Sequence, residues 1–467
     1  MLFSSFEFIF LFLPVTLALY YAAPMKIRNF VLLVMSIIFY GWDVKHYILL
    51  MLATIAVDYG MAIAVSAAVK RERRKTAKWL LALTIALNLA ILGFFKYFGF
   101  AADIFSSLTG IAVSVPEVTL PVGISFYTFQ SLSYVIDVYR QECAAQLNPV
   151  TFGAYVTMYP QLIAGPIVRY VDVEKQLQKR THSFAMFADG IRMFSVGLAK
   201  KVLLANPAGE MWTRYLEMPS DERSFVGAVL GVVFYTFQIY FDFSGYSDMA
   251  VGLGKMLGFE FCMNFNYPYT ATSIQDFWRR WHISLSTWFR EYVYIPLGGN
   301  RCTIPRHIFN LFAVWALTGL WHGASYNFVI WGVFYFVLLT GEKYVYGKAL
   351  AKLPVIAQRV YTLFFVGIGW LIFEMTSAQR IASYLPSFVG SGGWAKASDL
   401  WEIARNALFI VILAVGSTMI PVKLWRRLAS KASVMAYISI PLCMMAIILC
   451  CAFLASSGFN PFLYFRF

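Results

Sequence analysis

The chain has 467 residues, of which 60% are hydrophobic and only 13% charged. Its mean hydropathy of +0.65 excludes an ordinary soluble globular protein and indicates a multi-pass protein of the lipid bilayer. The formal net charge of +14 arises from Lys and Arg residues in short loops between apolar runs, as expected for cytoplasmic loops. We therefore expect no nucleic-acid partner.

The first apolar run, residues 6–21, lacks a basic region before it and is expected to be a retained helix. The basic cluster at residues 70–78 is the strongest in the chain, so we place it in the cytoplasm. This placement puts the N-terminus outside. Further spanning runs of this half are expected at 29–42, 47–68, 79–98 and 119–138.

Residues 150–168 form an apolar segment interrupted by Pro160, Gly165 and Pro166. Basic residues lie beyond both ends, which favours a re-entrant hairpin that returns to the cytoplasmic side. A proline-kinked spanning helix is the alternative.

The second half continues the alternation of apolar runs and basic loops. About twelve crossings satisfy all basic clusters and leave both termini outside the cytoplasm. We predict an all-α bundle of about 11–13 transmembrane helices, with re-entrant and interfacial helices around a central tunnel. Residues 1–400 would form the core, and residues 401–467 a two-helix hairpin with an extracytoplasmic aromatic tail. The expected runs are 184–204, 225–243, 307–325, 326–346, 356–376, 401–421 and 434–456.

An arginine-rich helix is expected over residues 276–294, on the cytoplasmic side. Its arginines, together with Arg301, are candidates for binding the phosphates of a cytosolic cofactor, and lipid head groups are an equal alternative. These residues are Arg279, Arg280, Arg290 and Arg301. The apolar face of the helix, at i, i+3, i+4 spacing, comprises Trp278, Trp281, His282, Leu285, Trp288, Phe289 and Tyr292.

Two of the five histidines are candidate catalytic residues. His322 lies in the sequence GLWHG, about 15 residues or roughly 22 Å into an apolar run, where glycines are expected to leave space round the imidazole. An ordinary imidazole has a pKa of about 6.5 and accepts a proton from a hydroxyl at neutral pH. His282 taken alone is more typical of a satisfied interfacial histidine.

Two aspartates, Asp242 and Asp248, lie in or near an apolar run among glycines. Structural support is favoured over direct catalysis for both. Asn264 and Asn266 are expected to shape a turn. The six cysteines show no metal-ligand spacing, and we expect no metal. Serine hydrolase, zinc protease and NTPase motifs are absent from the sequence.

The chain closes on an aromatic tail, residues 456–467, which contains Tyr464. An interfacial anchor explains such a tail. The alternative is that Tyr464 enters the outer mouth of the bundle as a nucleophile.

These motifs resemble the membrane-bound O-acyltransferase family, in its bacterial polysaccharide O-acetyltransferase branch, which includes the membrane subunit of alginate O-acetylation. The similarity covers nearly the whole chain. It is carried by MLFSSFEFIFLFLPV, LPVGISFYTFQSLSYVIDVYR, YPQLIAGPIVR, YFDFSGYSDMAVGLG, NFNYPY, FWRRWHISLSTWFREYVYIPLGGNR and GLWHGASYNFVIWG.

The resemblance implies an acetyl-CoA-dependent O-acetyltransferase, multi-pass in the bacterial cytoplasmic (inner) membrane. His322 would be the catalytic histidine and His282 would line the same tunnel, positioning the thioester or stabilising the oxyanion. Acetyl-CoA would bind at the inner mouth, and the acetyl group would leave outside. A separate extracytoplasmic partner protein would then acetylate an exopolysaccharide of the cell envelope. The related teichoic-acid D-alanylation system has a one-helix partner with an acyl-accepting tyrosine, which the last helix and Tyr464 resemble in cis.

Two other functions stay open at this point. A transporter of polysaccharide or lipid-linked precursor would use buried His and Asp residues as a proton relay. An acyltransferase with a lipid or protein acceptor would keep the chemistry and change the substrate.

Overall fold

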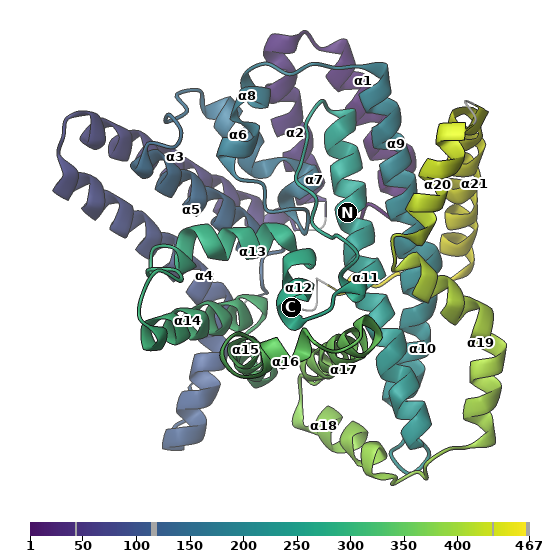
Figure 1. Ribbon diagram of the computed structural model, residues 1–467. Coiled ribbons are helices and arrows are strands. Elements are labelled where there is room, and N and C mark those ends of the chain that lie inside the picture. The colour runs from purple at the N-terminus through teal and green to yellow at the C-terminus, as the bar shows by residue number, and fades with distance from the viewer. Residues whose placement is uncertain (43, 114–118, 432–433, 464–467) are drawn as a thin grey trace. The chain divides into compact units, whose positions relative to one another are not determined.

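The structure is a computed structural model that describes residues 1–42, 44–113, 119–431 and 434–463. The described residues form helices and turns and contain no strand, which confirms the all-helical class (Figure 1). They divide into two compact units. Unit 1 comprises residues 1–194 and 247–262, and unit 2 comprises residues 195–246 and 263–467. The predicted division at residue 400 stays a prediction.

Unit 1 contains two long helices, α3 (Ile48–Lys70) and α4 (Arg74–Thr109), which pack on each other and on α5 (Ile124–Arg140) (Figure 1). α2 (Arg28–Gly41) packs on α6 (Pro149–Thr157). The other elements that begin in this unit are η1 (Glu7–Phe12), α1 (Leu13–Ala22), η2 (Met25–Ile27), η3 (Lys45–Tyr47), α7 (Tyr159–Leu162), α8 (Tyr170–Gln178) and α9 (Phe184–Ala199).

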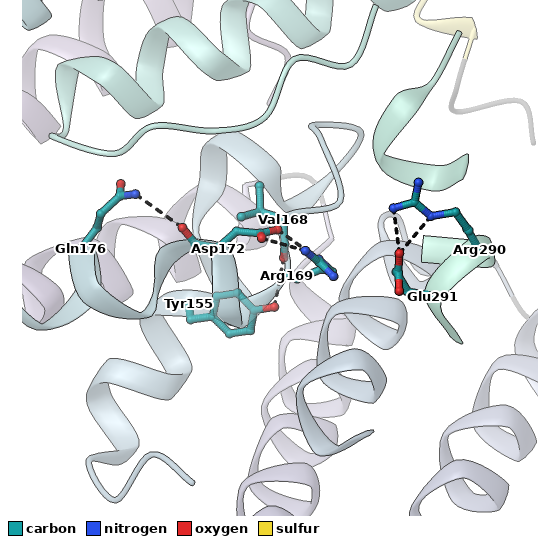
Figure 2. A network of polar contacts seen from close by, with 7 residues as sticks. All are labelled: Tyr155, Val168, Arg169, Asp172, Gln176, Arg290 and Glu291. Carbon is teal, nitrogen blue, oxygen red and sulfur yellow. Dashed lines mark hydrogen bonds and ion pairs between the residues drawn. The ribbon is translucent and has the colours of Figure 1, made fainter. Parts of the chain in front are cut away.

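The interrupted segment 150–168 forms two short helices, α6 and α7, and a turn. α6 has nine residues, about 14 Å of helix, against a hydrocarbon core of about 30 Å. The hydroxyl of Tyr155 donates to the carbonyl of Val168 over 3.0 Å and closes the turn (Figure 2). The segment is therefore no single kinked spanning helix, and the re-entrant course stays a prediction.

Unit 2 is built round α14 (Ile304–His322) and α15 (Tyr326–Gly341), with α17 (Val355–Glu374) packed on α15. α11 (Phe225–Met256) belongs to this unit as far as Tyr246. The other elements are η4 (Lys200–Ala205), α10 (Asn206–Glu217), η5 (Pro268–Thr270), α12 (Ile274–Arg280), α13 (Ile283–Phe289), η6 (Arg290–Tyr294), η7 (Glu342–Tyr346), α16 (Gly347–Leu350), α18 (Ala378–Tyr384), η8 (Leu385–Val389), α19 (Ala397–Gly416), α20 (Ile420–Lys431) and α21 (Val434–Ser456).

Within the described ranges, six helices are long and apolar enough to cross a membrane, and a bent pair raises the number to seven. The expected 11–13 crossings include runs that form shorter helices, such as the 14 residues of α2 and the 17 of α5. The six helices span Lys45–Lys70, Arg74–Thr109, Phe225–Met256, Tyr326–Leu350, Val355–Glu374 and Tyr437–Ser456.

Two predicted elements differ from the structure. The expected helix 276–294 is broken at His282, which separates α12 from α13. The expected two-helix C-terminal hairpin contains three helices, because the chain bends by 71° between α19 and α20 before α21 begins. The apolar face predicted for residues 276–294 continues through the break at His282, so its period gives no sign of that break.

Candidate active site

His322 is the last residue of α14 and is half-buried at a small cavity in unit 2. The cavity volume is about 30 Å³, room for about one or two water molecules. Most of the residues in its wall are aromatic. The lining residues are Ile239, Asp242, Phe243, Trp278, Trp281, His322, Trp331, Trp370, Phe373, Phe462 and Leu463.

Aromatic rings hold the His322 imidazole by their edges and faces. The ring centroids of Trp331 and Phe373 lie 5.1 and 5.2 Å from that of His322, at nearly perpendicular angles. The side-chain amide of Asn327 donates to the carbonyl of Phe373 over 2.7 Å and fixes that wall. Most of this wall is apolar, so charge that develops on the imidazole is weakly screened and interacts strongly with its surroundings.

The sequence suggested that the glycines of GLWHG leave space round the imidazole. In the structure they have a different role. A Cβ on Gly319 would lie 2.4 Å from the carbonyl oxygen of Phe328, and one on Gly323 would lie 2.2 Å from the Phe328 ring. On the facing helix, a Cβ on Gly332 would lie 2.5 Å from the carbonyl oxygen of Trp315. These glycines allow α14 and α15 to approach closely, and this contact places His322.

His282 is buried at the break between α12 and α13, with a left-handed backbone of φ 44°. Such a conformation is strained for a residue other than glycine and needs support from its surroundings. Asn264 provides it: its Oδ1 accepts from Ser284 N at 3.1 Å, from Ser284 Oγ at 2.9 Å and from His282 Nδ1 at 3.2 Å. Asn264 thus does more than shape a turn.

The Asn264 oxygen also fixes the tautomer of His282. A backbone N–H always donates, so the bond from Ser284 N identifies this atom of Asn264 as the acceptor oxygen. His282 Nδ1 therefore carries the proton. Burial lowers the pKa of His282 to about 3, so the ring is neutral and Nε2 presents a lone pair. Among the described residues, this Nε2 has no hydrogen-bond partner.

Trp321 is near both candidate histidines. Its ring centroid is 6.0 Å from that of His282 and 5.0 Å from that of His322. His282 is absent from the cavity wall, but it contacts Phe243, which lines the cavity, at a centroid distance of 4.7 Å. The structure therefore brings the two histidines to the same aromatic cluster without direct contact.

Two of the four candidate phosphate-binding arginines already pair with carboxylates. Arg280 lies 2.8 Å from Asp276, and Arg290 lies 2.7 Å from Glu291 (Figure 2 shows the second pair). Arg279 and Arg301 are exposed, and no ion pair of theirs occurs in the described part of the chain. Arg279 and Arg301 are therefore more available than Arg280 and Arg290 for an anionic ligand.

The two aspartates of α11 lie in different environments. Asp242 lines the cavity and pairs with Lys201 of η4 at 2.7 Å, whereas Asp248 is half-buried and does not belong to the cavity wall. Our sequence reasoning missed Lys201. A lysine within the apolar run 184–204 was the available signal, because an unpaired charge there is costly.

The C-terminal segment enters the same site. Phe462 and Leu463 are buried and line the cavity with His322. Tyr464, the candidate nucleophile, lies outside the described residues.

An all-helical protein with a histidine at a small, mostly aromatic cavity is compatible with a transferase, and comparison with known proteins identifies the class. Residues 38–384 match the MBOAT, membrane-bound O-acyltransferase family. The chain is 42% identical over 401 residues to the probable alginate O-acetylase AlgI of Pseudomonas aeruginosa, covering 84% of this chain and 76% of that protein.

Two further relatives carry related names. The peptidoglycan O-acetyltransferase of Helicobacter pylori is 33% identical over 433 residues, covering 84% of this chain and 80% of that protein. The teichoic acid D-alanyltransferase of Bacillus subtilis is 28% identical over 272 residues, covering 54% and 68%. The chain belongs to the membrane-bound O-acyltransferase family and is an O-acyltransferase.

Proposed function

We propose that this protein transfers acetyl groups from cytosolic acetyl-CoA across the cytoplasmic membrane for O-acetylation of an extracytoplasmic polysaccharide. The observation that carries the proposal is the cavity at which His322 and the C-terminal residues Phe462 and Leu463 meet. The relatives named for alginate and peptidoglycan acetylation support acetyl as the acyl group and a glycan as the final acceptor. A separate extracytoplasmic partner protein completes the polymer step.

His322 acts as the general base in this proposal. Its imidazole takes the proton of an acceptor hydroxyl, and the oxygen attacks the carbonyl carbon of the thioester. The C–S bond then breaks, and the imidazolium returns the proton to the CoA thiolate. The products are an acetyl ester and the free thiol, so atoms and charges balance without a further reactant.

The protonation state of His282 favours one of its two expected roles over the other. The resemblance implied that it positions the thioester or stabilises the oxyanion. A neutral ring protonated on Nδ1 offers a lone pair at Nε2, which accepts a hydrogen bond and cannot donate one to an oxyanion. We therefore assign His282 to positioning, through an N–H or O–H group of a substrate. Arg279, Arg280, Arg290 and Arg301 remain the proposed contacts of the CoA phosphates.

Tyr464 is the proposed first acceptor, because it follows Leu463 directly and Leu463 lines the cavity. A phenol has a pKa of about 10, so attack on a thioester requires a base such as His322. Family membership favours this enzyme over the transporter, and the names of the relatives favour a glycan over a lipid or protein as the final acceptor.

The test combines purified full-length protein, acetyl-CoA and mass measurement of the C-terminal peptide. The wild type should release CoA thiol and gain one acetyl group on Tyr464. His322→Ala should reduce both by about 10²–10⁴-fold, the usual contribution of a general base. His46→Ala is the control, because it removes an exposed histidine of unit 1. Full activity of His322→Ala would exclude the proposed base.

A further inference from the structure

The C-terminal segment is held along unit 2 by a series of polar contacts. Ser457 Oγ donates to Glu210 of α10 over 3.1 Å. Asn206, at the start of the same helix, donates from its side-chain amide to Asn460 Oδ1 over 3.2 Å. The segment therefore follows α10 towards the buried end of that helix.

A buried ion pair binds the backbone of two of the next three residues, Pro461 and Leu463. Lys201 and Asp242 lie 2.7 Å apart, and each side chain is only 3% exposed. Lys201 Nζ also donates to the carbonyl of Pro461. Asp242 Oδ2 accepts from the backbone N–H of Leu463 over 3.0 Å. Each partner of the pair thus contacts the segment.

The residue between these two contacts is held by its side chain. The ring of Phe462 stacks on Tyr246 of α11 with centroids 4.6 Å apart. The side chains of Phe462 and Leu463 then form part of the cavity wall beside His322. Backbone contacts fix the position of the segment along its length, and the side chains direct it into the cavity.

A buried ion pair is a weak source of stability. Removing two charges from water costs several kcal/mol per ion, and the attraction between the charges must first offset this cost. The remaining hydrogen-bonding capacity of both groups must also be satisfied. Here it is satisfied by Asn206, which accepts from Lys201 Nζ at 2.9 Å, and by the tail backbone. A pair that served only to join η4 to α11 would not need the tail.

We propose that Lys201 and Asp242 form a peptide clamp, a binding site for the backbone of residues 461–463 that docks the chain's own C-terminal segment at the His322 cavity. The two residues are positioning residues that act through the tail. Docking itself does not depend on the chemistry of the tail. Its consequence for acyl transfer, the delivery of Tyr464 to His322, rests on the proposed function.

Hydrogen exchange of the C-terminal peptide in the full-length protein tests the clamp. The double variant Lys201→Met/Asp242→Leu removes both contacts without leaving a buried unpaired charge, and it should retain the fold. We expect the amides of residues 459, 460, 462 and 463 to exchange at least about tenfold faster than in the wild type. Unchanged exchange in the folded variant would overturn the proposal.

The matched control is Arg380→Met/Glu374→Leu. It removes another ion pair at the end of α17, in which the guanidinium of Arg380 lies 2.9 Å from the buried carboxylate of Glu374. Tail exchange should be unchanged there. A similar acceleration in this control would mean that general loosening, and not the clamp, releases the tail.

A change on the tail side separates docking from core stability. Leu463→Pro removes the donated N–H and leaves the ion pair intact, whereas Leu463→Ala keeps the N–H. Exchange at residues 459, 460 and 462 should accelerate in the proline variant. It should be slower in the alanine variant. Equal rates in both would count against the backbone contact.

The clamp and the role of Tyr464 as acceptor can be refuted independently of each other. A wild-type tail that is protected but never acetylated would refute Tyr464 as acceptor and keep the clamp. An acetylated tail with the same exchange in the double variant would keep the acceptor and refute the clamp.

Discussion

Asn264 determines the chemical state of His282. Its single carbonyl oxygen accepts three hydrogen bonds, and these fix the left-handed turn, the proton on Nδ1 and the free lone pair on Nε2. Loss of an acceptor for buried donors costs about 1–3 kcal/mol for each group. The asparagine therefore contributes to the site without contacting the cavity.

The buried His282 predicts a pH dependence of stability. Its folded pKa of about 3 lies below the ordinary value of about 6.5 for the unfolded chain. Above pH 6.5 His282 is neutral in both the folded and the unfolded protein, so it contributes nothing to the pH dependence of stability. As the pH falls from about 6.5 towards 3, only the unfolded state binds the proton, so this residue lowers stability by up to about 1.4 kcal/mol per pH unit.

Thermal unfolding in detergent at pH 7 and pH 5 measures this effect. The wild type should lose more stability at pH 5 than His282→Gln, which has no titrating ring. The same loss in both proteins would contradict the assignment of a neutral His282.

Tyr464→Phe tests the acceptor at the scale of one atom. It removes the hydroxyl and keeps the aromatic ring, so we expect polymer acetylation to fall to background while the protein accumulates normally. Tyr437→Phe is the control, because Tyr437 is an exposed tyrosine of α21. Normal polymer acetylation by Tyr464→Phe would return the tail to the role of an anchor.

The contact of α14 with α15 fixes the position of His322. The facing glycines Gly319 and Gly332 let each helix approach the carbonyl groups of the other, and side chains larger than hydrogen would meet backbone atoms that cannot turn away. The helix pair is therefore part of the site, although its glycines have no reactive side chain.

Gly332→Ala should separate α14 from α15 and displace His322. Overpacking of this kind costs about 1–3 kcal/mol, so both thermal stability and acetyl transfer should fall. Gly367→Ala is the matched control within α17, where the new Cβ would make only an ordinary contact of 3.7 Å with Val232. That variant should be as stable as the wild type or slightly more stable, because alanine favours a helix. Equal behaviour of the two variants would mean that the helix contact does not position the histidine.

The proposed direction of acetyl transfer is a property of the whole molecule and depends on its orientation. The basic cluster at 70–78 predicts a cytoplasmic loop. The sequence also predicts that the polar stretch 377–400, which contains α18 and η8, lies outside. The proposed tail acceptor requires that its end of the bundle face outwards.

Cysteine labelling in intact cells tests this orientation. In a Cys262→Ser background, an impermeant maleimide should label Ser398→Cys directly and Arg73→Cys only after the membrane is permeabilised. All three native positions are exposed. The reverse pattern would invert the topology and remove the basis for outward transfer.

The sequence alone determined the class of protein, the family and the buried face of the 276–294 segment. Trp278, Trp281 and His282 are buried as their spacing predicted, because the hydrophobic pattern records which side leaves water. It also supplied both histidines, because charged or titratable groups are rare in apolar runs.

Only the tertiary structure decided where these groups meet. The break at His282 depends on Asn264, 18 residues away, and the contacts of the tail with Asp242 join residues 221 apart. No local pattern encodes such pairings, since they arise when separate helices pack and their buried polar groups must find partners. The sequence therefore defined the chemical groups, and the packing of unit 2 gave them their geometry.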